Sequence, residues 1–205
     1  MSRARACLLF GAALYVFAAG AWGYALPPSC TSAKGVTDQT TPIAALRKRV
    51  EAQLDSDPTA AFATLCATIP RVEREYGPRS VELAWWVGSL ATPLIAYMDK
   101  FDEALPALQF AQPILERRYG RYGEPLGDIH VAYAWTYLRQ GRLPQSAAAW
   151  QAALEVRQRH PGKKKIELQK VLVGLAQVQL AQRDFPRARQ NLDRAQASWS
   201  TTTTR

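Results

Sequence analysis

The chain has 205 residues, of which 48% are hydrophobic and 21% are charged. These fractions are close to those of ordinary globular domains, so the composition excludes a wholly disordered or collagen-like chain. Lys and Arg number 26 against 17 Asp and Glu, and the formal charge of +9 favours acidic partners or an anionic membrane surface. Because the basic residues are interleaved with acids rather than clustered with aromatics, the sequence indicates no nucleic-acid groove.

Residues 1–25 have the composition of an export signal. Two arginines precede an apolar run from Cys7 to Ala21, and small residues follow it before a pair of prolines. Cleavage is expected after Gly23 or Ala25, since each choice puts small residues at the two positions that a signal peptidase inspects. The alternative is an uncleaved membrane anchor, because about 20 apolar residues cross a bilayer and this run approaches that length. We predict a signal peptide and a periplasmic or secreted protein, with a membrane location only if the segment is retained.

The remainder divides into three parts. Residues 26–40 are rich in Pro, Ser, Thr and Gly and are expected to form a flexible linker that does not pack. Residues 41–199 are expected to form one helical domain, and residues 200–205 a disordered polar tail.

Removal of the leader leaves two cysteines, Cys30 and Cys66. An even number of cysteines in an oxidising compartment permits a disulfide, which would add about 3 kcal/mol of stability by loop closure. The alternative is that Cys66 is simply a small buried apolar residue, because it lies on one helical face with Leu65 and Ile69.

Apolar spacing and helix start signals predict eight helices in four pairs. Thr41-Pro42 and Asp57-Pro58 mark helix starts, and Gly77-Pro78 marks a helix end. Pro93 falls inside the third predicted helix and should kink or interrupt it. The expected helices cover residues 42–54, 58–76, 80–98, 101–119, 125–140, 143–159, 165–182 and 185–199.

An internal repeat is the strongest feature of the sequence. The apolar residues Phe101, Leu143 and Phe185 are equally spaced along the chain and serve as its anchors. Offsets of 3, 7 and 10 from each anchor carry a small residue, a large residue and an alanine, and these offsets share one helical face. The small residue lets two helices approach, and the large one fills the space beside them. The three sets are Ala104, Leu108 and Ala111; Ser146, Trp150 and Ala153; and Ala188, Leu192 and Ala195.

Two further signals support the same period. Nine positions before each anchor stands a small residue or its substitute, at Thr92, Ala134 and Ala176. Upstream, residues 73–77 match residues 116–120 at nearly the same interval. The repeating unit is therefore helix, short turn, helix.

This pattern resembles the tetratricopeptide repeat, in the longer variant of about 42 residues found in kinesin light chains. The resemblance covers Val81 to Trp199 well and Thr41 to Gly77 poorly. Gly141 stands at the turn glycine of the family, whereas Asp99 and Arg183 replace it in the neighbouring units, and Gln179 stands where the family prefers an aromatic or aliphatic residue. The resemblance implies an all-α solenoid of helical hairpins that curves into a right-handed superhelix, with the first helix of each pair on the concave side.

The resemblance also implies a scaffold that holds a protein or peptide partner in its concave groove. Carried onto this sequence, the ligand-facing positions are Trp86, Ser89, Tyr97, Val131, Trp135, Arg139, Lys170, Val173 and Gln177. Aromatic side chains beside Arg and Lys suit a peptide with an apolar residue and a carboxylate. The alternative for Trp86 and Trp135 is burial between helices. The end faces of a short solenoid could also bind a second copy, so self-association is a further option.

No catalytic or metal-binding motif accompanies the repeat. His130 and His160 are too far apart for a zinc site, and the sequence has no phosphate-binding loop, nucleophile elbow or His-Glu-x-x-His helix. We therefore expect no enzyme, no metal and no cofactor. Two alternatives stay open: a membrane-anchored assembly factor of a cell-envelope complex, and a helical hydrolase of cell-wall polymers, which would need paired carboxylates in a cleft.

Overall fold

The computed structural model describes residues 24–33, 39–160 and 165–200. In chain order these residues form the 3-10 helix η1 (Pro28–Thr31) and the α-helices α1 (Ile43–Ser56), α2 (Pro58–Tyr76), α3 (Val81–Ser89), α4 (Ala91–Ala96), α5 (Phe101–Tyr119), α6 (Glu124–Arg139), α7 (Leu143–Arg159), α8 (Lys165–Ala181) and α9 (Phe185–Ser200). The described part of the chain contains no strand, and the all-α prediction is confirmed. The predicted signal segment up to Gly23, and residues 201–205 of the predicted tail, lie outside the described residues.

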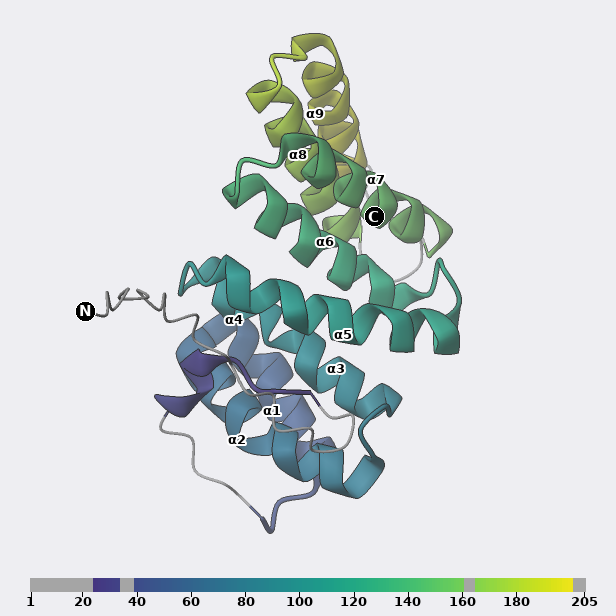
Figure 1. Ribbon diagram of the computed structural model, residues 1–205. Helices are drawn as coiled ribbons and strands as arrows, with labels where there is room; N and C mark the ends of the chain where they lie inside the picture. The colour runs from purple at the N-terminus through teal and green to yellow at the C-terminus, as the bar shows by residue number, and fades with distance from the viewer. Residues whose placement is uncertain (1–23, 34–38, 161–164, 201–205) are drawn as a thin grey trace, which may run out of the picture.

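Each helix packs against the helices next to it in the chain. Figure 1 shows the result as a stack that begins with α1 and α2 at one end and finishes with α8 and α9 at the other. Among the described residues, none of these helices combines the length and the apolar character that a membrane span requires.

Local signals set the helix ends as the sequence predicts. The Asp57 carboxylate accepts a hydrogen bond from the Ala60 N–H at the start of α2 (3.0 Å), which satisfies one of the unpaired donors of the first turn. Ser80 caps α3 in the same way, accepting from the Leu83 N–H (3.1 Å). The third predicted helix is interrupted at Leu90, three residues before Pro93, and becomes the two helices α3 and α4. The expected effect of the proline is therefore confirmed.

The period of the sequence recurs in the backbone. Asp99, Gly141 and Arg183 occupy the turns before α5, α7 and α9, and all three have left-handed φ angles of 53°, 72° and 60°. The residue after each turn residue closes the turn with a 2.8 Å hydrogen bond to a carbonyl of the preceding helix. These bonds run from Lys100, Arg142 and Asp184 to Leu94, Tyr137 and Gln179. The turns before α7 and α9 thus share one geometry, with a bond that spans five residues, whereas the bond from Lys100 spans six. Only one of the three left-handed positions has the glycine that this conformation favours.

The small residues of the repeat lie where paired helices touch. Ala104, Ser146 and Ala188 are all buried. The Ser146 hydroxyl donates a 2.7 Å hydrogen bond to the Ala134 carbonyl of the neighbouring helix, so a polar side chain is accommodated at this contact. The repeat read from the sequence is therefore also a repeat of packing.

The buried side chains form two clusters. The larger draws mainly on α1 to α6, and the smaller on α6 to α9. Trp135 of α6 packs against both, and its ring meets that of Trp150 edge to face at 5.4 Å. Ala149 of α7 also packs against both clusters, so α6 and α7 together join the two halves of the stack.

The expectation of an unpacked linker is wrong for residues 26–33. Cys30 is bonded to Cys66 of α2, so the permitted disulfide is present. Both the N–H and the hydroxyl of Ser29 donate to the Glu103 carboxylate of α5, at 3.0 and 2.9 Å. The Tyr24 ring packs at 5.2 Å from that of Phe110, and burial, with the Glu103 charge second, raises the pKa of its hydroxyl. We call residues 24–33 the N-terminal strap, because they tie α2 to α5.

A glycine exchange tests the shared turn geometry. Gly141→Ala puts a β-carbon on a left-handed residue and should cost about 1–2 kcal/mol of unfolding free energy. The reverse change, Arg183→Gly, removes that penalty and should leave stability equal or higher by up to about 1 kcal/mol. Urea unfolding followed by circular dichroism measures both. Equal losses from the two changes would contradict a common turn.

Candidate functional site

The helix α8 carries an exposed stripe of mixed character. Lys170, Val173, Gln177 and Leu180 are spaced at helical intervals and therefore share one face of α8. All four are exposed, and the two apolar members keep 38% and 46% of their accessible surface. The opposite face of α8 supplies buried residues to the smaller cluster, among them Val171, Leu172, Leu175 and Val178. The predicted positions Lys170, Val173 and Gln177 thus lie on an accessible surface.

The corresponding stripe on α6 lies one repeat earlier. Val131, Trp135 and Leu138 are half-buried and pack against the smaller cluster. Arg139 is exposed, and its guanidinium forms a 2.8 Å ion pair with Asp99 and lies 5.5 Å from the centre of the Phe101 ring. We call the residues of these two stripes the α6–α8 surface: Val131, Trp135, Leu138, Arg139, Lys170, Val173, Gln177 and Leu180.

Two members of this surface, Leu138 and Leu180, are not among the positions predicted from the sequence. Each stands two helical turns after a predicted member, Val131 or Val173, and the two leucines lie one repeat apart. The period could therefore have found them.

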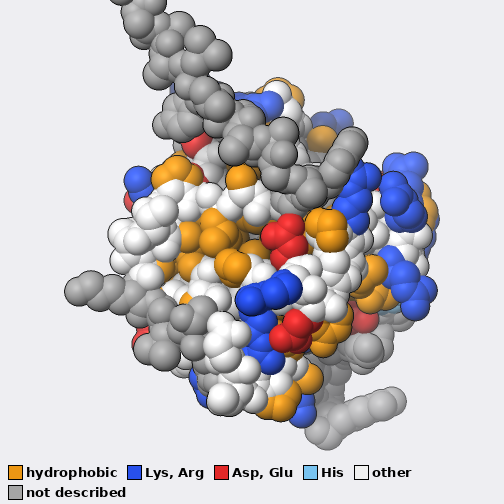
Figure 2. Space-filling view, turned by 60° about the horizontal axis from the view of Figure 1, so that its bottom comes forward, with side chains coloured by type: hydrophobic (Ala, Val, Ile, Leu, Met, Phe, Trp, Pro, Cys, Tyr) orange, Lys and Arg blue, Asp and Glu red, His pale blue; other side chains and the backbone are white. Residues whose placement is uncertain are grey.

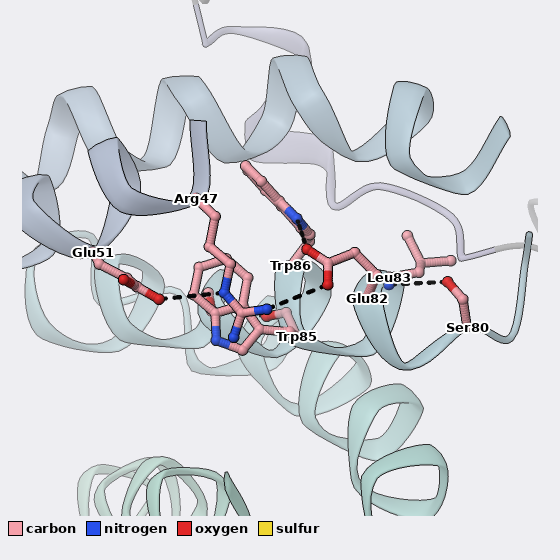
Figure 3. Close-up of polar contacts among 8 residues, drawn as sticks. Arg47, Glu51, Ser80, Glu82, Leu83, Trp85 and Trp86 are labelled. Atoms are coloured by element: carbon pink, nitrogen blue, oxygen red, sulfur yellow. Dashed lines mark hydrogen bonds and ion pairs between the residues drawn. The ribbon is translucent and has the colours of Figure 1, made fainter. Parts of the chain in front are cut away.

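The prediction that Trp86 faces a ligand in the groove is wrong, because this residue lies on no accessible surface. Its side chain has no exposed area. Its indole N–H donates to Glu82 one turn earlier in α3 (3.1 Å), and Glu82 also pairs with Arg47 of α1 (3.3 Å). Figure 3 shows the Arg47 guanidinium lying over the neighbouring Trp85 ring, at 4.1 Å from its centre. The contact with α1 thus occupies the side of α3 that a ligand was expected to reach.

The two remaining predicted positions differ from each other. The Ser89 hydroxyl donates to the Trp85 carbonyl in its own helix (2.8 Å), so its hydrogen bond is used locally. Tyr97 is 60% exposed at the end of α4.

Figure 2 views the end of the stack that lies at the bottom of Figure 1, where acidic and basic side chains alternate beside a hydrophobic area. That end is thus a mixed surface without a single dominant charge.

Two contacts hold α6 and α8 in position through α7. A β-carbon on Gly174 of α8 would lie 2.3 Å from the Trp150 ring, so the absence of a side chain lets the indole reach the helix backbone. Arg157 of α7, nearly buried, pairs with Asp128 of α6 and approaches Glu167 of α8 at 3.8 Å. The α6–α8 surface therefore rests on a fixed support.

A shallow depression of about 320 Å³ lies among α5, α6 and α7. Tyr133 and Tyr137 stack at 5.8 Å along it, and burial foremost raises the pKa of the Tyr133 hydroxyl. The other residues that line it are Gln109, Gln112, Gln145, Ala148 and Ala149. The lining contains no carboxylate, imidazole or thiol that could serve in acid–base or nucleophilic chemistry.

The two histidines occupy separate environments. Burial, as the largest cause, lowers the pKa of His130. His160 lies with its Nε2 atom 2.8 Å from the Tyr122 carbonyl oxygen. Within the described residues, His, Cys, Asp and Glu side chains nowhere gather in a group of three that could hold a metal ion.

No protein-family model matches this chain, and no curated protein matches it. The geometry of the chain itself therefore carries the functional argument.

Paired substitutions test the division between core and surface. Trp86→Ala should lower the free energy of unfolding by about 3–5 kcal/mol, because it empties a fully buried site. Val173→Ser and Leu180→Ser should each lower it by no more than about 1 kcal/mol, because both side chains keep more than a third of their surface in solvent. Chemical unfolding measures all three, and a large loss from either α8 variant would show that this stripe is covered.

Proposed function

We propose that this chain is an exported scaffold of the tetratricopeptide-repeat type, which binds a protein or peptide partner and catalyses no reaction. The single observation that supports this most is the exposed apolar and basic stripe of α8, where Val173 follows Lys170 by one turn and Leu180 follows Val173 by two. The repeated turns at Asp99, Gly141 and Arg183 support the repeat class. In this proposal the hairpins form a right-handed superhelix, and α6 and α8 line its concave side.

The side chains of the α6–α8 surface suit a ligand with an apolar anchor and a carboxylate. Val173, Leu180 and the accessible part of Trp135 offer apolar area. Arg139 offers a planar guanidinium that can hold a carboxylate with two hydrogen bonds. Its present partner is Asp99, and both side chains of that pair are more than half exposed, so the pair is weak and can be exchanged for a ligand.

Site-specific photo-crosslinking in the native cell tests the surface. With p-benzoylphenylalanine in place of Val173, we expect a crosslink to one defined partner, whereas the same probe at the exposed position Arg74 of α2 should give none. With the isolated partner, Arg139→Ala, Val173→Asp and Leu180→Asp should each weaken binding by about tenfold, the loss expected for one important interface contact. Unchanged affinity in all three variants would exclude this surface.

The N-terminal strap bears on the choice of cleavage site. Tyr24 packs against Phe110, so cleavage after Gly23 keeps this anchor whereas cleavage after Ala25 removes it. We therefore propose that the mature protein begins at Tyr24 and lies in the periplasm or outside the cell. The alternative, a membrane-anchored assembly factor of an envelope complex, requires the whole segment before Tyr24 to be retained.

Intact-mass analysis of the protein from its native envelope separates these two cases. We expect a mass that lacks residues 1–23 and rises by about 2 Da on reduction, because the bond between Cys30 and Cys66 gains two hydrogens. A protein that keeps Met1 and sediments with membranes would favour the anchored assembly factor. A mass that does not change on reduction would mean that the disulfide is absent.

A further inference from the structure

The outer face of α9 is an apolar stripe with a cation at its centre. Phe185, Arg189, Leu192 and Gln196 are spaced at helical intervals and share one face. All four are exposed, and Phe185 and Leu192 keep 61% and 43% of their accessible surface. We call these four residues the α9 face.

The same face is covered on the two preceding hairpins. On α7 the matching residues are Leu143, Ala147, Trp150 and Leu154, which pack with residues of α8 in the smaller cluster. Trp150 keeps only 1% exposure because the backbone of α8 at Gly174 lies against its ring. On α5 the matching Leu108 is fully buried, and Phe101 and Leu105 pack in the larger cluster. In each case the helix that follows in the stack is packed against this face, and on α9 no helix of the described part of the chain is.

The charge of Arg189 limits which ligands can bind to the α9 face. It takes the position that Leu105 holds on α5 and Ala147 on α7, between two exposed apolar side chains. Within the described part of the chain it makes no ion pair or hydrogen bond. A helix laid across the face would bury this guanidinium, and burial of an unpaired charge is costly unless an opposite charge meets it.

We propose that the α9 face binds an amphipathic α-helix of another protein, in the place that α8 takes on α7, with an acidic side chain of that helix opposite Arg189. Apolar residues on either side of the acidic one cover Phe185 and Leu192. This surface is separate from the α6–α8 surface, so the two sites can be occupied independently.

A second copy of this chain is a poor occupant. Stacking end to end would bring the outward face of α1 against α9, and that face carries Lys48, Arg49 and Asp55, all of them exposed, so its cations outnumber its acids. Lys48 and Arg49 would then approach Arg189, and like charges close together in an interface are destabilising. Two α9 faces meeting each other would likewise bring two copies of Arg189 together.

Two synthetic helical peptides test the proposal on the full chain. They have the same leucine positions, but one carries Glu and the other Lys beside the apolar stripe. Fluorescence anisotropy should show binding of the Glu peptide that weakens with added salt, and at least about tenfold weaker binding of the Lys peptide. Arg189→Glu should reverse this preference, and the double change Phe185→Ser with Leu192→Ser should abolish binding of both peptides.

Matched controls separate this site from the rest of the surface. Arg194→Glu makes the same charge change at an exposed position away from the α9 face and should leave the preference as it is. Val173→Asp, which alters the α6–α8 surface, should also have no effect on the Glu peptide. Circular dichroism confirms that each variant is folded.

Three results would overturn the proposal. They are equal binding of the two peptides, no binding of the Glu peptide, and a preference that Arg189→Glu leaves unchanged. A concentration-dependent dimer in sedimentation that Leu192→Ser removes would assign the face to a second copy instead.

Discussion

Two helices can approach closely only where the side chain between them is small, and this constraint organises the whole stack. Ala104, Ser146 and Ala188 supply such a residue once in each of the three later hairpins. Ser146 shows how strict the requirement is, because its hydroxyl is accommodated by donating to the Ala134 carbonyl across the contact. Once this approach is fixed, the turn before each second helix has little freedom, and even Asp99 and Arg183 adopt a conformation that favours glycine.

Close packing within a hairpin decides which faces are left for other molecules. The helix α8, the first of its pair, turns one side to the smaller cluster, and the stripe on its opposite side is exposed. The second helix of a pair packs one face against the first helix of the next hairpin. On α9 this is the α9 face, and it is exposed. Both surfaces proposed for binding are therefore sides of helices that the packing of the hairpins leaves uncovered, one along the stack and one at its end.

The repeat could be predicted from the sequence because it depends on local spacing. The constant interval between Phe101, Leu143 and Phe185 predicted the hairpins, the turns and the buried small residues, and Pro93 predicted the interruption between α3 and α4. The same interval places Leu138 and Leu180 on the α6–α8 surface, although family resemblance alone did not select them.

Contacts between distant residues could not be predicted in this way. Trp86 occupies the repeat position of Asp128 and Lys170, but it is fully buried in the larger cluster and its indole N–H donates to Glu82. The N-terminal strap has the composition of a linker, yet it packs through contacts with residues far along the chain. Cys30 is bonded to Cys66, 36 residues later, and Ser29 donates to Glu103, 74 residues later. The count of cysteines permitted the Cys30–Cys66 bond without requiring it, whereas the Ser29–Glu103 contact has no signal in the sequence and was found only in the folded structure.

The strap gives the two ends of the stack unequal resistance to opening. It joins α2 to α5, so a covalent bond and two hydrogen bonds reinforce the larger cluster. The helices α8 and α9 belong to the smaller cluster, which these links do not reach. When the free energy of local unfolding differs along a structure, the least stable segment unfolds first, and its amide protons exchange with solvent first. We therefore expect α8 and α9 to open before α2 and α5, because the disulfide and hydrogen bonds of the strap do not reach them.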